Sequence, residues 1–481
     1  MSRPVVLAPN PPPLLEPGVT PGSSCPHRAR MPDPDLLIIG AGVAGIAAAR
    51  LAVTQGRTVR ILEARPRLGG RVASSHVLGA PFDLGARWLH NAEDNPLATL
   101  ARGLGIPLTD ADAARREVTF IGGRRATAAE TADYDAAFAA FEAALAERAR
   151  ALGPDDIAAG DAAPAGGSWD ATVSAWCGQI ISAWPLAAMS LRDYADNALN
   201  GRNLLPHGGM AALLERLAEG LPITLSAPVE RLRWGGAEAV AEGPFGAVRA
   251  CAAICTVPTT PLVEGAIRFD PALPAETLQA AADLPLGAVL KVGFRAAGED
   301  RLGFGPFTST DRRIAPGEEL VTINLWPFGC DQATCYLGGP AAAELEREGD
   351  AAAEAFMRDE IARRFGAGAA RAFAAGAVVT SWLRDPWSRG VYSHARVGRA
   401  GARAALGAPL AGGRLMPATS AWPERSAARG VRAKRRPTPR SRLWLDPRNR
   451  GRRQTRHGND ERERRAAGGA RRGGRQNPRA L

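Results

Sequence analysis

The most informative apolar pattern in the chain lies around residue 40. Residues 36–39 form an apolar run of strand length, glycines follow at once, and residues 46–53 continue as an Ala-rich segment. A short apolar run before glycines predicts a buried strand, and the longer segment after them predicts a packed helix. A second strand is expected over residues 58–62, so the pattern predicts a strand–turn–helix–strand unit of the α/β class.

The pattern is mainly helical up to residue 200 and mixed beyond it. Residues 155–167 are rich in Ala, Gly, Asp and Pro, which predicts a surface loop. A helix is expected over residues 211–217, and strands over residues 223–234 and 247–257. Four side chains recur at helical spacing and predict one core-facing stripe: Tyr134, Phe138, Phe141 and Leu145.

The glycines after the first strand predict a dinucleotide site. Gly40 permits a sharp turn, Gly42 lets the backbone approach a pyrophosphate, and Gly45 lets the helix pack closely on the strand. Ala44 lies at the start of the helix, whose free N–H groups attract an anion. Glu63 ends the second strand about 20 residues downstream, where a carboxylate accepts from ribose hydroxyls and repels a 2′-phosphate.

The residues after the second strand carry further motifs. Arg65, Leu68-Gly69-Gly70-Arg71 and Asp83-Leu84-Gly85-Ala86-Arg87-Trp88 follow in order, and the chain resembles the flavin-dependent amine oxidases here. The resemblance implies a Rossmann-like FAD-binding domain interleaved with an α+β substrate domain. Val391 stands where covalently flavinylated members have a cysteine, so non-covalent FAD is expected. Arg65 and Arg71 suit a pyrophosphate, because the planar guanidinium fork of an arginine matches its oxygens. The implied FAD contacts are Gly40, Gly42, Ala44, Gly45, Glu63, Ala64, Arg65, Gly70, Arg71, Gly85, Ala86, Arg87, Trp88 and, through its backbone, Val229.

Lys291 is isolated by composition. The chain has 60 basic residues, of which only Lys291 and Lys434 are lysines. The segment 284–294 resembles the family strand whose lysine holds a water beside flavin N5, a task that suits a compact ammonium and not a guanidinium fork. A solvated lysine at a strand end is the alternative interpretation.

Two further segments imply substrate contacts. Trp88-Leu89-His90 with Asn95-Pro96-Leu97 is similar to a turn of polyamine oxidases, which implies that His90 hydrogen-bonds an amine; a structural loop histidine is an equal alternative. The segments 382–386 and 390–394 resemble the family segment whose aromatic residues wall the substrate side of the flavin. Tyr392 and Trp382 are therefore candidate wall residues, with core packing as the alternative.

Net charge and cysteine content limit the kinds of site and the location that this protein can have. The net charge of +11 comes from the C-terminus, because residues 421–481 hold 20 basic and 5 acidic residues against 40 and 44 elsewhere. The six cysteines lack the paired spacing of a zinc site, so no metal is expected. Cys251 and Cys255 are expected to share one face of a strand as a core pair. Without a signal peptide or an apolar span, a soluble cytoplasmic protein is expected.

The expected organisation is two interleaved domains. A Pro-rich leader covers residues 1–30, and Met31 is a candidate start. The expected segments are 31–100 and 201–270 for the FAD-binding domain, 101–200 and 271–395 for the substrate domain, 396–423 for an incomplete return to the FAD-binding domain, and 424–481 for an Arg-rich tail.

The chain departs from the family after Leu415. The family has a Phe-Ala-Gly-Glu or Asp motif and a flavin-facing helix there, whereas this chain reads Met416-Pro417-Ala418-Thr419-Ser420. A shifted reading frame permits the family motif, so a frameshift near residue 415 is the preferred hypothesis. A nucleic-acid-binding arm is the alternative explanation of the basic tail.

The resemblance implies an oxidoreductase that removes hydride from the carbon beside an amine, with polyamines among the expected substrates, and passes the electrons from FAD to oxygen. Two alternatives stay open. One is an FAD-dependent desaturase or oxidase of a non-amine substrate. The other is an inactive remnant whose basic tail binds nucleic acid nonspecifically.

Overall fold

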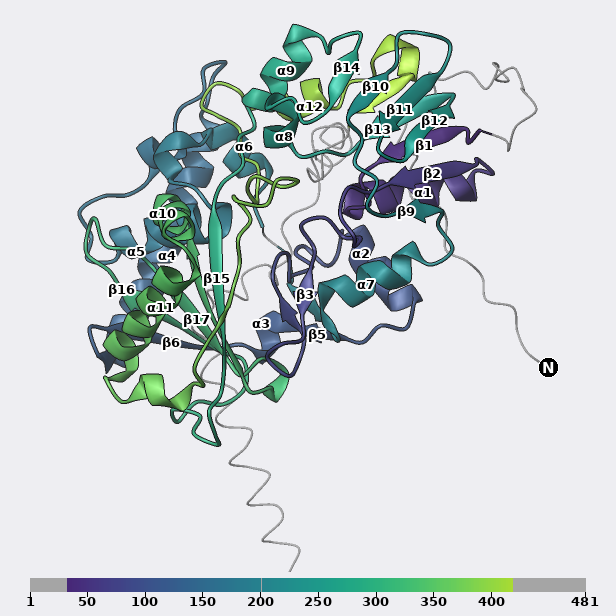
Figure 1. Ribbon diagram of the computed structural model, residues 1–481. Coiled ribbons are helices and arrows are strands. Elements are labelled where there is room, and N and C mark those ends of the chain that lie inside the picture. The colour runs from purple at the N-terminus through teal and green to yellow at the C-terminus, as the bar shows by residue number, and fades with distance from the viewer. Residues whose placement is uncertain (1–32, 200, 418–481) are drawn as a thin grey trace, which may run out of the picture.

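The computed structural model describes residues 33–199 and 201–417, which form two lobes built on separate sheets (Figure 1). The first sheet has five parallel strands in the order β20-β13-β1-β2-β9. Both faces of such a sheet are covered, which explains why its central strands are apolar. The strands are β1 (Leu36–Ile39), β2 (Val59–Leu62), β9 (Ile223–Thr224), β13 (Ala252–Cys255) and β20 (Leu415–Pro417).

Helix α1 (Val43–Thr54) follows β1 and packs against β1 and β2, so the predicted strand–turn–helix–strand unit is confirmed. Helix α7 (Gly209–Ala218) contacts α1 and confirms the helix expected at residues 211–217. The first sheet therefore gathers strands from widely separated parts of the chain, and the turn after β1 lies at their shared carboxyl edge.

The second sheet has seven strands in the order β19-β15-β18-β17-β16-β6-β7, antiparallel except for the β16–β6 pair. Helices α10 (Pro340–Glu348) and α11 (Asp350–Phe365) cover one face, where apolar side chains of the sheet and helices form a core. The opposite face is more polar. Its strands are β6 (Arg116–Ile121), β7 (Arg124–Arg125), β15 (Val289–Arg295), β16 (Thr308–Arg313), β17 (Thr322–Leu325), β18 (Gln332–Gly338) and β19 (Val378–Val379).

Helix α4 (Ala128–Arg150) carries the predicted apolar stripe. Phe141 and Leu145 are buried in a cluster against which Tyr134 and Phe138 pack, so the stripe is confirmed. A capping box fixes the start of α4, because Thr127 Oγ1 accepts from the backbone N–H of Glu130 and the Glu130 carboxylate accepts from that of Thr127.

Two of the strand predictions are wrong. Residues 223–234 contain β9 and, after a break, β10 (Arg231–Arg233), and these two strands belong to different sheets. Residues 247–257 likewise divide into β12 (Gly246–Ala250) and β13. Cys251 lies between these two strands, so it does not share a strand face with Cys255. In both ranges the sequence was interpreted as one strand, whereas the chain leaves one sheet and enters another within the range.

The remaining elements complete the two lobes. A four-stranded sheet has the order β12-β11-β10-β14, with β11 at Ala239–Gly243 and β14 at Arg268–Asp270. Short pairs join β3 (Ser74–Ser75) to β4 (Phe82–Asp83) and β5 (Leu108–Asp110) to β8 (Leu204–Pro206). The other α-helices are α2 (Pro96–Gly103), α3 (Ala111–Ala114), α5 (Asp170–Ala175), α6 (Leu191–Asp196), α8 (Thr259–Val263), α9 (Ala275–Ala282) and α12 (Ala402–Leu406).

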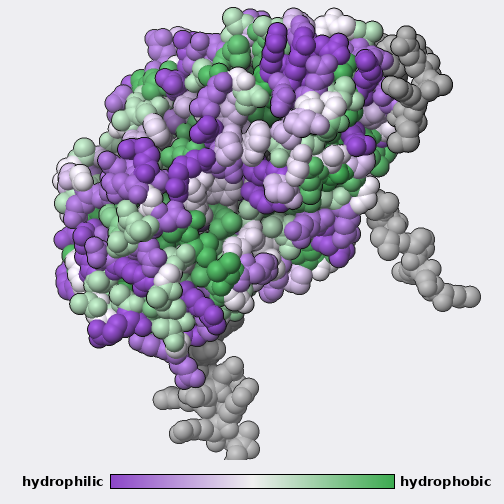
Figure 2. Space-filling view, viewed as in Figure 1, coloured by the Kyte–Doolittle hydropathy of each residue, from purple (hydrophilic) through white to green (hydrophobic). Residues whose placement is uncertain are grey.

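Hydrophilic side chains predominate on the visible outer surface, and apolar ones appear in smaller groups (Figure 2). Among the described residues, no helix combines the length and the apolar character that crossing a membrane requires. The expected leader, the Arg-rich tail and the segment from Ala418 that supports the frameshift hypothesis lie outside the described residues.

Candidate active site

The turn between β1 and α1 has the geometry of an anion site. Gly40 has φ +102°, a value that favours glycine, and a Cβ on Gly45 would lie 1.9 Å from the carbonyl oxygen of Gly40. Gly42 is the N-cap of α1 and provides no side-chain cap, and the only atom near its Cβ position is the Gly69 carbonyl oxygen at 4.0 Å. The first N–H groups of α1 are therefore available to an anion.

Glu63 is buried beside this turn, with 3% of its surface exposed. Its Oε2 accepts from the backbone N–H of Ala41 at 2.7 Å, and its Oε1 accepts from that of Arg65 at 2.9 Å. The carboxylate thus joins the glycine turn after β1 to the segment after β2. Its predicted contact with a ribose stays a prediction, and Glu63 also lines the adjoining cavity.

The two arginines expected at the pyrophosphate contact the second lobe. Arg65 Nη2 donates to Asp385 Oδ1 and to Ser388 Oγ, both at 2.7 Å. Arg71 Nη1 donates to the carbonyl oxygen of Val391. Burial and the nearby Arg65 guanidinium lower the pKa of Arg71 to about 10. Both arginines line the cavity while tying the lobes together, and their contact with a pyrophosphate stays a prediction.

A cavity of about 2140 Å³ is lined by residues of both lobes. This volume exceeds the ~300–1,000 Å³ of a common small-molecule pocket and suits a dinucleotide together with a substrate. Every residue expected to contact cofactor or substrate lines the cavity except Gly45, which packs against Gly40. Val229, the least specific of these expectations, is 6% exposed in the first-lobe core and also reaches the cavity wall.

Lys291 lies on the cavity face of β15 and is 6% exposed. Its ammonium donates to the carbonyl oxygens of Asp83, at 3.2 Å, and Gly85. Burial lowers the pKa of Lys291 to about 8, and the neighbouring Asp83 carboxylate opposes that shift. The lysine is thus a buried cation at the cavity wall, which excludes the alternative of a solvated strand end.

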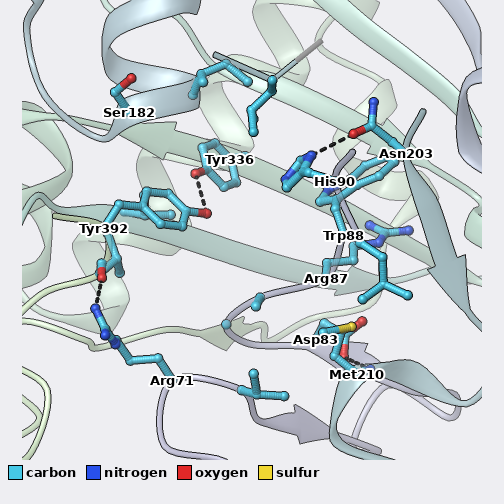
Figure 3. A pocket seen from close by; sticks show the side chains of 18 of the residues that line it. Arg71, Asp83, Arg87, Trp88, His90, Ser182, Asn203, Met210, Tyr336 and Tyr392 are labelled. Atoms are coloured by element: carbon cyan, nitrogen blue, oxygen red, sulfur yellow. Dashed lines mark hydrogen bonds between the residues drawn. The ribbon is translucent and has the colours of Figure 1, made fainter. Parts of the chain in front are cut away.

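Aromatic side chains face one another near this lysine. The hydroxyls of Tyr392 and Tyr336 are 3.5 Å apart across the cavity (Figure 3), and Lys291 Nζ lies 6.0 Å from the Tyr336 ring centre. Tyr392 is 42% accessible because it opens into the cavity. Trp382 is buried and donates from Nε1 to the Leu84 carbonyl oxygen at 3.1 Å, beside Gly85. The tyrosines therefore form an open aromatic wall, and Trp382 supports the loop to which Lys291 binds.

His90 is held by a short relay of polar groups (Figure 3). Asn203 Nδ2 donates to Asp112 at 3.0 Å, which leaves Asn203 Oδ1 as the acceptor 2.6 Å from His90 Nδ1. A neutral His90 therefore carries its proton on Nδ1 and keeps a lone pair on Nε2. Burial lowers the pKa of His90, so the neutral form is favoured near neutral pH. Its ring stacks against Trp88, with centroids 6.4 Å apart.

Sequence reasoning missed Tyr336 and Asn203. The sequence signal for Tyr336 was the rarity of tyrosine, because the chain has only four. The structure places all four on this cavity: Tyr134, Tyr194, Tyr336 and Tyr392. Asn203 gave no such signal, because its role depends on Asp112 and His90, which come from distant parts of the chain.

Comparison with known proteins identifies the family. A family model described as flavin-containing amine oxidoreductase matches residues 43–431. The chain belongs to this family. Members carry a flavin, and the glycine turn, the uncapped α1 N-terminus and the large cavity fit one here. The matched segment extends beyond the described residues into the Arg-rich C-terminus.

Individual relatives agree with the family assignment. The amine oxidoreductase chain is 29% identical to polyamine oxidase 5 of Oryza sativa subsp. japonica over 399 residues, covering 76% of this chain and 78% of the relative. It is 28% identical to lysine-specific histone demethylase 1 homolog 1 of the same plant, but the match covers 58% of this chain and only 36% of that protein.

Solved structures share the fold. A wild-type putrescine oxidase bound to putrescine matches with a TM-score of 0.67 and 20% identity, covering 80% of this chain and 93% of that one. Cyclohexylamine oxidase from Brevibacterium oxydans matches with a TM-score of 0.67 and 21% identity, covering 81% of this chain and 93% of that one. The predicted α/β fold class is confirmed.

Proposed function

We propose that this amine oxidoreductase binds FAD non-covalently and oxidises the carbon beside an amine nitrogen to an imine, which water then hydrolyses. The proposed substrates include polyamines, and the proposed electron acceptor is molecular oxygen. The observation that carries the proposal is the placement of the buried Lys291 ammonium and the Tyr336–Tyr392 wall on the same cavity as the glycine turn. When bound, the flavin supplies the hydride acceptor and the redox chemistry.

The proposed work of the protein is to position and desolvate the amine. An aromatic wall attracts an ammonium by about 0.5–2 kcal/mol and orients it, which gives Tyr336 and Tyr392 their role. Lys291 is proposed to hold a water close to the reacting carbon. The lone pair on His90 Nε2 is proposed to accept a hydrogen bond from the amine, because Asn203 occupies the other ring nitrogen.

The proposed cofactor contacts follow from the lining of the turn. The N-terminus of α1 and Gly42 are proposed to meet the pyrophosphate, and Glu63 the ribose. Arg65 and Arg71 are proposed to add positive charge near the phosphates while they keep their bonds to the second lobe. Val391 supports a non-covalent flavin, since it offers no sulfur to form a thioether.

The names of the relatives support the substrate class. Polyamine oxidase 5 and putrescine oxidase are both named for amines that carry more than one nitrogen. The cavity lining runs from the glycine turn to α4, so the cavity offers room for an extended substrate as well as a cofactor. An amine substrate is therefore favoured over the non-amine substrate of a desaturase.

The test uses the full-length chain mixed with FAD and freed of excess cofactor. We expect flavin absorption bands to co-purify, to bleach when an amine is added without oxygen, and to return with hydrogen peroxide when air is admitted. Tyr392→Leu should weaken amine-dependent bleaching and leave the oxidised spectrum intact. A flavin that no amine bleaches would favour a non-amine substrate, and a chain that holds no flavin would contradict the proposal.

A further inference from the structure

The cavity continues past the aromatic wall, along the face of the seven-stranded sheet opposite α10 and α11. Strand register pairs Lys291 with Tyr336 and Tyr336 with Thr322, and a hydrogen bond joins Thr322 to Asp311 on the next strand. These four cavity-lining residues therefore form one row across adjacent strands. Adjacent strands are about 4.8 Å apart, so Asp311 lies roughly 10 Å beyond Tyr336 and roughly 14 Å beyond Lys291 along the row. The row thus begins at the proposed reaction centre and reaches a carboxylate.

We propose that Asp311 binds the distal ammonium of a di- or polyamine whose reacting nitrogen lies at the Tyr336–Tyr392 wall. This inference rests on the proposed function and makes it more specific. It predicts that this enzyme recognises a substrate by two positive charges separated by roughly 10 Å, and it assigns to Asp311 the choice of chain length.

The local geometry fixes the carboxylate in place. Its Oδ1 accepts from Thr322 Oγ1 at 2.7 Å, and its Oδ2 accepts from Trp176 Nε1 at 3.2 Å. Each oxygen has a further lone pair, so Asp311 can bind an ammonium without giving up either contact. Within the described residues Asp311 forms no salt bridge. A substrate cation would therefore be its first ion-pair partner.

The surroundings suit a cation with an alkyl stem. Tyr134 and Phe138 of α4 and Trp176 line the cavity there, with Phe138 and Trp176 ring centres 5.4 Å apart. Aromatic faces attract ammonium groups and pack on methylene chains. Arg364, behind the sheet, and Arg115 favour the ionised form of Asp311, but burial outweighs them and raises its pKa. A substrate ammonium beside Asp311 would stabilise the charged carboxylate and so offset the cost of burying it.

The experiment compares octylamine with octamethylenediamine, which differ only in the second ammonium. Equilibrium binding to the full-length chain is measured by anaerobic calorimetry, and KM is measured with FAD and oxygen. We expect the wild-type chain to prefer the diamine by about tenfold or more, as a charge-assisted hydrogen bond contributes. Asp311→Asn should bring the affinities for the two amines within about twofold of each other, because it weakens binding of the diamine alone. Glu348→Gln, at an exposed carboxylate outside the cavity, should keep the preference.

The outcomes separate this inference from the proposed function. If the wild-type chain oxidises octylamine but shows no diamine preference, Asp311 does not bind a distal ammonium and the amine oxidase proposal stands. An Asp311→Asn protein that matches the wild type in circular dichroism and keeps the preference would also overturn the inference. If no amine bleaches the flavin, the proposed function fails, and calorimetry still reports the diamine preference. If Asp311→Asn does not fold, the wild-type preference decides.

Discussion

Glu63 provides the most direct test of how the glycine turn is held. Its two carboxylate oxygens accept from the N–H groups of Ala41, at 2.7 Å, and Arg65, at 2.9 Å, in a site where only 3% of the residue is exposed. Glu63→Gln keeps the shape of the side chain but replaces one oxygen by an amide nitrogen. One backbone N–H then loses its acceptor, and the other loses a charged one.

The expected cost follows from these two changes. A charged hydrogen bond contributes about 1.5–3 kcal/mol, and a buried donor without an acceptor costs about 1–3 kcal/mol. Because the two effects overlap, we expect Glu63→Gln to lower the free energy of unfolding by about 2–4 kcal/mol in the flavin-free chain. A loss of this size is a large part of the stability of an ordinary domain.

Urea unfolding of the flavin-free chain measures the effect, with Glu348→Gln as a matched control on an exposed helical surface. The control should stay within about 0.5 kcal/mol of the wild type. If the free energy of unfolding of Glu63→Gln also stayed within that limit, the structural role of the carboxylate would be refuted. If stability is unchanged but FAD affinity falls, the carboxylate acts on the ribose alone.

Two further predictions concern titrating groups. The pKa of Lys291 is lowered to about 8 in the folded chain. Above that pH the folded chain loses the Lys291 proton while the unfolded chain keeps it. The stability of the wild type relative to Lys291→Met should therefore rise by up to about 3 kcal/mol between about pH 8 and pH 10, and a flat difference in urea unfolding would contradict the burial of the ammonium. In Asn203→Leu, His90 should lose its fixed Nδ1–H tautomer and its pKa should fall, because the Asn203 contact raises it. NMR of the imidazole nitrogens, assigned with His90→Gln, would disprove the relay if the tautomer were unchanged.

The sequence by itself determined the local architecture of the nucleotide end. Gly40, Gly42 and Gly45 act within one turn, and a run of four apolar residues before them can only be a buried strand in that context. Lys291 was also recognisable, since a lone lysine among arginines indicates a need for a compact ammonium. These features depend on covalent neighbours or on composition, so no tertiary information was required.

The tertiary structure decided which distant residues meet. The row from Lys291 through Tyr336 to Asp311 depends on how the strands pair, and a slip of one residue would turn each of these side chains to the opposite face. The break between β9 and β10 depends on how two sheets share one core, and the pairing of Arg65 with Asp385 depends on where the lobes pack. Register and docking are set by the burial of whole faces, a property of the assembled core that no single stretch of sequence contains.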